Sequence, residues 1–176
     1  MSNIVLIGMS GAGKTTIGKY LAKKLNMTLV DTDDIIVKKT GSTIDEIFNN
    51  RGEKYFRELE KKVVEEVSKY DSAVITTGGG VVLNRTNIDC LRNNGVIFLL
   101  QASVETLYNN LKREGMLNDH RPLLKGPDLK KRLEKLYKER KNLYISSADY
   151  IIQVDGKAVD EIGNEIIFIF ESLKPL

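Results

Sequence analysis

The sequence predicts an α/β protein whose parallel sheet is covered by helices on both faces. Short apolar segments alternate along the chain with segments in which apolar residues recur every three or four positions, as on amphipathic helices. The short segments contain few polar residues, so each strand would be buried on both faces, which is typical of a parallel sheet. The length of 176 residues suits a single domain, 1–176, with one core.

Five short apolar segments are the predicted strands. They lie at residues 3–7, 27–30, 73–77, 96–100 and 150–154. Predicted helices cover the periodic segments at residues 17–25, 44–48, 56–67, 87–92, 104–111, 129–143 and 159–173. Thr43 and Glu46 form a capping-box pattern at the start of one of these helices. Residues 112–125 are polar, include Gly115 and contain Pro122, and therefore predict an exposed mobile loop.

The composition excludes several classes of protein. The net charge is only +3 and residues of both signs are interspersed, so a nucleic-acid partner is not predicted. Every apolar stretch is far shorter than the roughly 20 residues that cross a membrane, and the N-terminus lacks the pattern of a secretion signal. Cys90 is the only cysteine, which excludes an internal disulfide. We therefore expect a cytoplasmic monomer that binds neither nucleic acid nor membrane.

Residues 8–15 carry the strongest functional signal in the chain. They read Gly-Met-Ser-Gly-Ala-Gly-Lys-Thr and match the phosphate-binding pattern G-x-x-x-x-G-K-[ST] between a predicted strand and a predicted helix. Backbone N–H groups of such a P-loop face the phosphates, Lys14 reaches the β- and γ-phosphates, and the Thr15 hydroxyl helps to hold Mg²⁺. The loop predicts phosphoryl transfer with ATP and Mg²⁺ as cofactors. The predicted nucleotide-binding residues are Gly11, Ala12, Gly13, Lys14, Thr15 and Thr16.

An acidic cluster follows the second predicted strand. It reads Asp31-Thr32-Asp33-Asp34. Beside a P-loop, one carboxylate could hold a metal-bound water and another could accept a proton from an attacking hydroxyl. An Asp cluster after a strand is also typical of a helix N-cap and turn, and both interpretations stay open at this point.

A triple glycine and three arginines are further candidates for a substrate site. Glycines 78–80 follow the third predicted strand, and three together indicate backbone brought close to something bulky, although a flexible turn is the alternative. Arg57, Arg121 and Arg140 carry planar guanidinium groups that suit carboxylates and phosphates, although each alone is typical of a solvated surface. His120 is the only histidine, so a metal site or nucleophile pair built on two histidines is excluded.

Beyond the P-loop, a series of short motifs resembles the shikimate kinases. The motifs are Asp31-Thr32-Asp33, Gly52-Glu53, Phe56-Arg57-Glu58-Leu59-Glu60, the glycines at 78–80, Arg121-Pro122-Leu123-Leu124, and Arg140 before Leu143-Tyr144. The resemblance runs from residue 3 almost to the C-terminus. It implies a three-layer α/β/α fold of the nucleoside-monophosphate-kinase type, with a five-stranded parallel sheet in the order 2-3-1-4-5. It also implies transfer of the ATP γ-phosphoryl group to the 3-hydroxyl of shikimate, a step towards the aromatic amino acids.

The resemblance also implies roles for residues on the acceptor side. Asp33 would bind the reacting hydroxyl and act as its base, while Arg57 and Arg140 would clamp the carboxylate. The implied shikimate contacts are Asp33, Arg57, Gly78, Gly79, Gly80 and Arg140. Most of the acceptor-binding region would lie at about 31–61.

On the donor side the resemblance implies a metal contact and a lid. Asp31 matches the position that orients Mg²⁺ through water, beside Thr15 of the P-loop. Arg121 matches the arginine of a lid at about 112–125 that closes over the phosphates and takes part in catalysis together with Lys14. We assign Arg113 to stacking on the adenine, with residues 155–157 forming the other side of that pocket.

Other functions compete with this interpretation. A gluconate or nucleotide kinase of the same fold is the nearest alternative, but clustered arginines and a triple glycine favour a small carboxylated polyol. A GTPase switch is disfavoured because the D-x-x-G pattern at 160–163 lies in the last predicted helix and the sequence has no Asn-Lys-x-Asp motif. The modest charge also disfavours a nucleic-acid-handling P-loop module.

Overall fold

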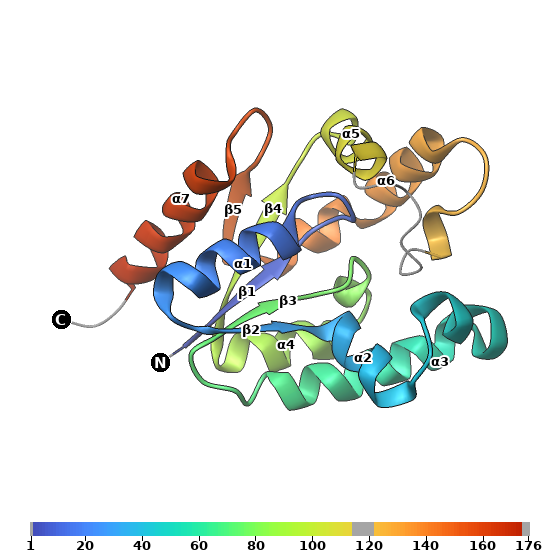
Figure 1. The fold of residues 1–176 in the computed structure, drawn as a ribbon, viewed down its shortest axis with the longest axis horizontal. Helices are drawn as coiled ribbons and strands as arrows, with labels where there is room; N and C mark the ends of the chain where they lie inside the picture. Colours follow the sequence, from blue (N-terminus) through green and yellow to red (C-terminus); the bar gives the residue numbers. More distant parts are fainter. Residues whose placement is uncertain (1, 114–121, 174–176) are drawn as a thin grey trace.

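A five-stranded parallel sheet forms the centre of the molecule. The computed structural model describes residues 2–113 and 122–173. The strands are β1 (Asn3–Ile7), β2 (Thr28–Asp31), β3 (Ala73–Thr76), β4 (Gly95–Gln101) and β5 (Tyr150–Gln153). Their order is β2-β3-β1-β4-β5 and every pairing is parallel, which confirms the predicted sheet (Figure 1).

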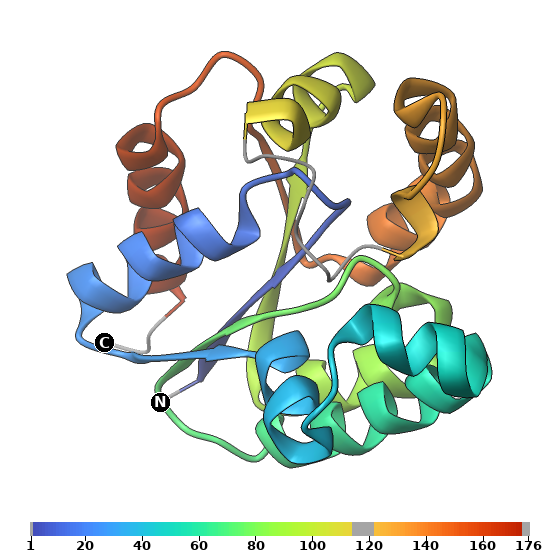
Figure 2. The same ribbon diagram turned by 45° about the vertical axis from the view of Figure 1, so that its right-hand side comes forward.

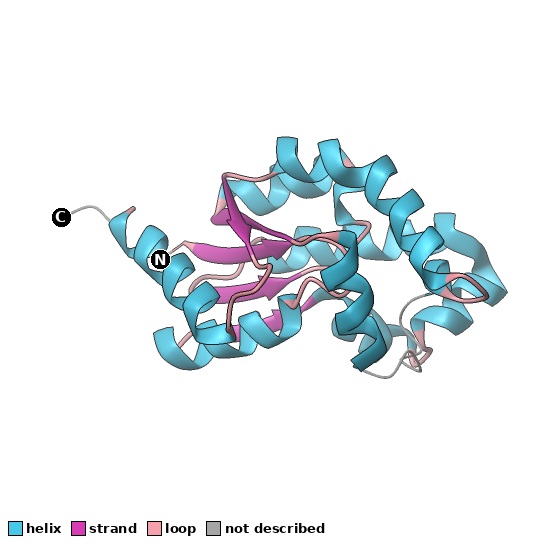
Figure 3. Cartoon of the chain, turned by 90° about the horizontal axis from the view of Figure 1, so that it is seen from above, coloured by secondary structure: helices cyan, strands magenta, loops and turns pink. Residues whose placement is uncertain are grey.

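Helices lie on both faces of this sheet. They are α1 (Lys14–Leu25), α2 (Thr32–Thr40), α3 (Ile44–Val67), α4 (Arg85–Asn93), α5 (Val104–Arg113), α6 (Leu129–Ser147) and α7 (Val159–Ser172), with two short 3₁₀ helices, η1 (Val81–Leu83) and η2 (Pro122–Leu124). Helices α1 and α7 pack together on one face, and α3 and α4 pack together on the other (Figure 2). Seen from above, the strands are enclosed between helices, as the predicted three-layer fold requires (Figure 3). None of the described helices is long and apolar enough to cross a membrane.

The central strands supply much of the core. Ile4, Val5, Leu6 and Ile7 of β1 are completely buried, as are Val74 and Ile75 of β3 and Ile97 and Phe98 of β4. A strand buried on both faces needs apolar residues at every position and not at alternate ones. The uninterrupted apolar segments therefore predicted the central strands correctly. Burial of every strand on both faces was wrong for the edge strands β2 and β5, which are partly exposed.

Two helical features refine the sequence prediction. The acidic cluster opens α2, which the apolar pattern alone did not predict, and the Asp31 side chain caps this helix by accepting hydrogen bonds from the backbone N–H groups of Asp33 (2.9 Å) and Asp34 (3.3 Å). The two helices predicted between 43 and 70 join into α3, with a kink at Gly52, whose φ of 80° and ψ of 168° are not helical. The predicted capping box of Thr43 and Glu46 is present at its start.

Parallel strands bring the chemically interesting segments to one edge of the sheet. The P-loop follows β1, the acidic cluster overlaps the end of β2, and the triple glycine follows β3. Because these three strands are neighbours, their carboxyl ends lie side by side, which is where open α/β sheets bind ligands.

Candidate active site

The P-loop wraps over the carboxyl end of β1 and leads into α1. Lys14 begins α1, and its ammonium group donates to the backbone oxygens of Gly8 (2.7 Å) and Met9 (2.9 Å), so it lies across the loop. Gly11 has a φ of 87°, and a Cβ added there would lie 2.8 Å from the backbone oxygen of Leu107. The Asn110 side chain on α5 donates to the oxygen of Gly11 at 2.8 Å. Helix α5 therefore fixes the loop from behind.

Asp31 is held rigidly at the end of β2. One carboxylate oxygen caps α2, and the other accepts from the Thr76 hydroxyl at 2.6 Å. Each carboxylate oxygen can accept more than one hydrogen bond, so Asp31 can still contact a metal-bound water. Among residues 2–113 and 122–173, no group of three or more His, Cys, Asp or Glu side chains forms a metal cage. Mg²⁺ bound to a nucleotide is held by one or two protein oxygens, waters and phosphates, so the donor set of Thr15 and Asp31 fits it.

The Asp33 carboxyl group has a buried oxygen, Oδ1, without a hydrogen-bond partner in the described part of the chain. Burial, together with the negative charges of Asp31 and Glu60, raises the pKa of Asp33 to about 7, against the opposing effect of Lys14 and Arg57. A carboxyl group whose pKa lies near neutrality is suited to take up and release a proton at physiological pH.

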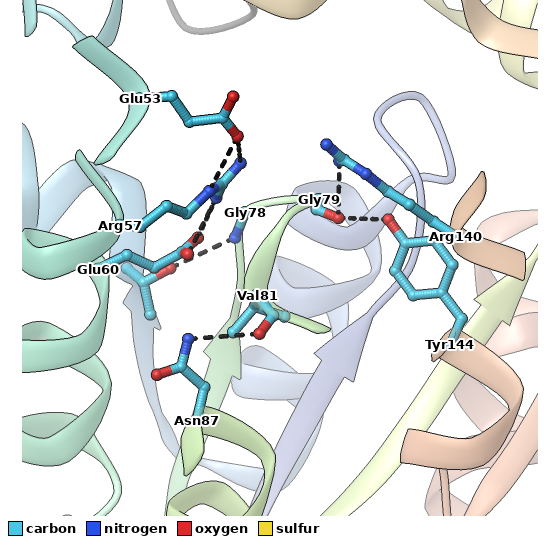
Figure 4. A network of polar contacts seen from close by, with 10 residues as sticks. Glu53, Arg57, Glu60, Gly78, Gly79, Val81, Asn87, Arg140 and Tyr144 are labelled. Atoms are coloured by element: carbon cyan, nitrogen blue, oxygen red, sulfur yellow. Dashed lines mark hydrogen bonds and ion pairs between the residues drawn. The ribbon is translucent and has the colours of Figure 1, made fainter. Parts of the chain in front are cut away.

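Arg57 is held in place by two carboxylates on its own helix. Its Nη1 lies 2.9 Å from Glu60, and its Nη2 lies 3.0 Å from Glu53 (Figure 4). Glu60 is only 1% exposed, and its burial raises the pKa of its carboxyl group although the charge of Arg57 lowers it. A guanidinium group has five N–H donors. Among the described residues, Arg57 makes four contacts with Glu53 and Glu60, so at least one of its donors remains for a ligand.

The triple glycine makes room for these side chains. A Cβ added at Gly78 would lie 2.8 Å from Oδ1 of Asp33, and a Cβ added at Gly80 would overlap the guanidinium of Arg57. At Gly79 an added Cβ would meet only ordinary contacts, the nearest at 3.5 Å. The bulky groups that the sequence predicted beside the three glycines therefore include the side chains of Asp33 and Arg57.

Helix α6 supplies the opposite wall of the site. Arg140 and Tyr144 lie one turn apart, and both donate to the backbone oxygen of Gly79, Arg140 through Nη1 at 3.2 Å (Figure 4). Both side chains are buried. Burial raises the pKa of Tyr144 to about 12, so its hydroxyl keeps its proton and stays a donor throughout the physiological range.

These groups surround one cavity of about 520 Å³ that opens to solvent. Its polar side contains Asp33, Arg57, Glu60 and Arg140 together with the glycine backbone. Its apolar side is formed by Ile44, Phe48, Phe56, Pro122, Leu123, Leu124 and Leu136. Met9 and Ser10 of the P-loop also line it, so a ligand in the cavity would lie next to a nucleotide on the loop. The shape and charge suit a small ring that carries a carboxylate and hydroxyl groups.

A family model described as shikimate kinase matches residues 10–170 of the chain. This chain belongs to the shikimate kinase family. It is 45% identical over 174 residues to the shikimate kinase of Caldanaerobacter subterraneus subsp. tengcongensis, with 99% of each chain covered. It is 47% identical over 169 residues to that of Caldicellulosiruptor bescii, with 96% of this chain and 95% of the relative covered.

Solved structures of shikimate kinases share the fold. The enzyme from Acinetobacter baumannii in complex with shikimate superposes with a TM-score of 0.91 at 35% identity, covering 99% of this chain and 96% of that one. The enzyme from Bacteroides thetaiotaomicron gives a TM-score of 0.85 at 30% identity, covering 97% and 98%.

The structure brings most of the predicted site residues of this shikimate kinase family member together. Asp33, Arg57, Arg140 and the three glycines line one cavity. Arg113 lies at the end of α5, where its Nη2 donates to the side-chain oxygen of Asn110 at 2.6 Å. It is thereby connected to the P-loop, and its contact with adenine stays a prediction. Arg121, His120 and residues 114–121 of the lid predicted at about 112–125 lie outside the described residues. The described parts of that segment differ from an exposed loop, because residues 112–113 end α5, residues 122–124 form η2 and Leu124 is buried.

Sequence reasoning assigned no individual role to several side chains that support the site. They are Glu53, Glu60, Thr76, Asn110 and Tyr144. Three of them were detectable in principle, because each shares a helix face with a predicted residue. Glu53 lies four residues before Arg57, Glu60 three residues after it, and Tyr144 four residues after Arg140. Thr76 and Asn110 reach their partners across the fold, and no local spacing indicates them.

Proposed function

We propose that this member of the shikimate kinase family transfers the γ-phosphoryl group of ATP to the 3-hydroxyl of shikimate, giving shikimate 3-phosphate and ADP. The observation that carries this proposal is the cavity beside the P-loop, which is lined by the Asp33 carboxyl group and by two arginines from different helices. The likeness to an Acinetobacter baumannii enzyme in complex with shikimate supports the same acceptor.

On the donor side, the chain binds and neutralises phosphate. Backbone N–H groups of the P-loop and the ammonium group of Lys14 hold the β- and γ-phosphates. Thr15 and, through water, Asp31 would hold Mg²⁺, which when bound offsets charge on the transferring group. Phosphoryl transfer depends on positioning and charge neutralisation more than on covalent chemistry, so these contacts supply much of what the donor requires.

On the acceptor side, the two arginines bind the shikimate carboxylate. Glu53 and Glu60 fix the plane of the Arg57 guanidinium, and the oxygen of Gly79 fixes that of Arg140. A planar fork of this kind matches a carboxylate and sets the orientation of the ring. The apolar wall covers the ring carbons. The clamp therefore selects which hydroxyl lies next to Asp33 and the γ-phosphate.

Asp33 accepts the proton in the transfer step. The 3-hydroxyl oxygen forms a bond to the γ-phosphorus while the bond from that phosphorus to the bridging oxygen of ADP breaks, and the hydroxyl proton moves to the Asp33 carboxylate. A pKa of about 7 leaves a large fraction of Asp33 ionised at neutral pH and still basic enough to receive the proton. The same cavity thus positions both the base, Asp33, and the 3-hydroxyl that attacks the phosphorus.

The remaining assignments belong to this proposal as well. We assign Arg121 to the closing lid, which would shield the γ-phosphate from water and add positive charge over it. Arg113 is assigned to the adenine. A monomeric state, a cytoplasmic location and the absence of a nucleic-acid partner complete the proposal.

A panel of acceptors tests the function. ADP release would be followed by a coupled assay with MgATP and shikimate, gluconate, AMP or no acceptor. We expect release to depend strongly on shikimate and to stay near the acceptor-free rate with the other compounds. Equal stimulation by gluconate or AMP would contradict shikimate kinase activity and would indicate another small-molecule kinase of this fold.

A further inference from the structure

The backbone oxygen of Gly79 is contacted by two side chains of one helix. It accepts hydrogen bonds from two side chains of α6, the guanidinium of Arg140 at 3.2 Å and the hydroxyl of Tyr144 (Figure 4). Residues four apart share a helix face, so one stripe of α6 holds this carbonyl. Arg140 is proposed to bind the acceptor carboxylate, whereas Tyr144 is not among the residues that line the acceptor cavity. The two donors therefore play different parts.

The glycine loop has few other lateral restraints. Three consecutive glycines have no side chains to pack, and their backbone is free to adopt many conformations. In the described part of the chain, the other hydrogen bonds of this loop are a long one from Gly78 N–H to the Thr32 hydroxyl (3.4 Å) and those within the following 3₁₀ turn. The peptide oxygen of Gly79 is thus oriented mainly by α6.

Tyr144 is well suited to hold this peptide without taking part in the reaction. Its side chain is 2% exposed and its pKa is raised to about 12, so it remains a neutral donor. The same hydroxyl lies 3.6 Å from the sulfur of Met9 in the P-loop. A Cβ added at Gly79 would lie 3.6 Å from the Tyr144 hydroxyl and 3.5 Å from Ser10, so Gly79 is packed between α6 and the P-loop.

We propose that Tyr144 is a positioning residue for acceptor binding. Its hydroxyl fixes the Gly79 peptide, and this peptide in turn orients the Arg140 guanidinium that clamps the acceptor carboxylate. Loss of the hydroxyl leaves the carbonyl to Arg140 alone and lets the loop and the guanidinium shift together. The main effect falls on the acceptor, because the hydrogen bonds of Lys14 to the backbone oxygens of Gly8 and Met9, and that of Asn110 to the oxygen of Gly11, do not involve the Tyr144 hydroxyl.

Tyr144→Phe is the test, because it removes only the hydroxyl. Tyr137→Phe on the same helix is the matched control, since that ring is also partly buried and lines the adjacent small cavity behind Met9 but not the acceptor cavity. One hydrogen bond contributes about 0.5–1.5 kcal/mol. We therefore expect KM for shikimate to rise about 3- to 10-fold in Tyr144→Phe, with KM for ATP within about twofold of wild type. Tyr137→Phe should change neither constant.

A combination with Arg140→Lys separates positioning from a general loss of stability. If Tyr144 acts through the group that Arg140 also contacts, the two changes together should raise KM for shikimate by less than the product of the single effects. Equal rises in both KM values, or an unchanged KM for shikimate, would overturn the inference.

This inference rests on the proposed function, and hydrogen exchange distinguishes the two. Backbone exchange in a peptide that covers residues 78–83 should be faster in Tyr144→Phe than in wild type and Tyr137→Phe, whatever the acceptor is. If shikimate does not stimulate the wild-type enzyme while exchange accelerates, the proposed function fails and the positioning of the loop stands. Unchanged exchange would overturn the role of Tyr144.

Discussion

Asp33 shows how the site uses an unfavourable interaction. In an unfolded chain an Asp carboxyl group titrates near pH 3.9, whereas burial raises the pKa of Asp33 to about 7. The folded protein therefore binds one more proton than the unfolded chain between about pH 4 and pH 7. The stability contributed by this carboxyl group is fully present below about pH 4 and is lost as the pH rises through 7. The ionised Asp33 carboxylate, which is the proposed base, therefore lowers the free energy of unfolding above about pH 7.

Asp33→Asn should separate these two effects. Turnover should fall by at least about a hundredfold, which is the usual contribution of a general base. The variant should also gain stability relative to wild type as the pH rises from about 4 to 7, by on the order of 1 kcal/mol per pH unit, because it lacks the ionising group.

Urea unfolding at pH 5 and pH 8, together with steady-state rates, measures both effects of Asp33→Asn. Asp34→Asn is the matched control, because Asp34 is exposed and does not line the cavity. If Asp33→Asn retains its turnover, Asp33 only positions the hydroxyl and does not act as its base. A stability difference that does not vary with pH would contradict its raised pKa.

Arg57 serves the fold and the substrate at once. Arg57→Ala should weaken shikimate binding by about 2–5 kcal/mol, the range for truncating one partner of a desolvated charge pair. The same change leaves the buried carboxylate of Glu60 without its cation, so we also expect a loss of about 3–5 kcal/mol in the free energy of unfolding near pH 8.

The double variant Arg57→Ala/Glu60→Gln distinguishes the two roles. It should recover much of the stability, because the uncompensated charge is gone, but none of the shikimate affinity. Isothermal titration with shikimate and urea unfolding would be run on the same samples. Shikimate affinity that returns with stability would move the carboxylate site away from Arg57.

At the scale of an element, the three glycines after β3 should not be equivalent. Gly78→Ala should displace the Asp33 carboxyl group and lower kcat, and Gly80→Ala should displace the Arg57 guanidinium and raise KM for shikimate, each by about tenfold or more. Gly79→Ala meets only ordinary contacts and should be the mildest of the three. Steady-state kinetics on the three variants would show this order. Equal losses in all three would mean that the loop requires glycine for its backbone alone.

The same loop illustrates what the sequence predicts and what it leaves open. Short uninterrupted apolar segments predicted the five strands, and spacing plus context predicted the P-loop, because these are local patterns. Helix α2 was predicted only through the N-cap interpretation of the acidic cluster, which the structure confirms, because no apolar periodicity indicated it. The reason for Gly78 and Gly80 could not be predicted either, because Asp33 and Arg57 reach the loop from other elements.

At the scale of the whole molecule, the parallel sheet joins a donor half to an acceptor half. The P-loop follows the central strand β1, while the acceptor walls come from α3 on one side and α6 on the other. The strand order places β3, and beyond it β2, beside the strand that carries the P-loop, so a substrate held by the two arginines, as proposed, would lie beside the γ-phosphate. Shikimate kinase activity is therefore a property of the strand order as much as of any single side chain.

The position of the transferred phosphate tests this account most directly. After reaction with MgATP and shikimate, phosphorus and proton NMR would identify the product and compare its amount with that of ADP. We expect one product, phosphorylated on the 3-oxygen, in equal amount to ADP, because the proposed arginine clamp would present one hydroxyl and the proposed lid would shield the phosphate from water. ADP formed without phosphorylated shikimate, or phosphate on another hydroxyl, would contradict it.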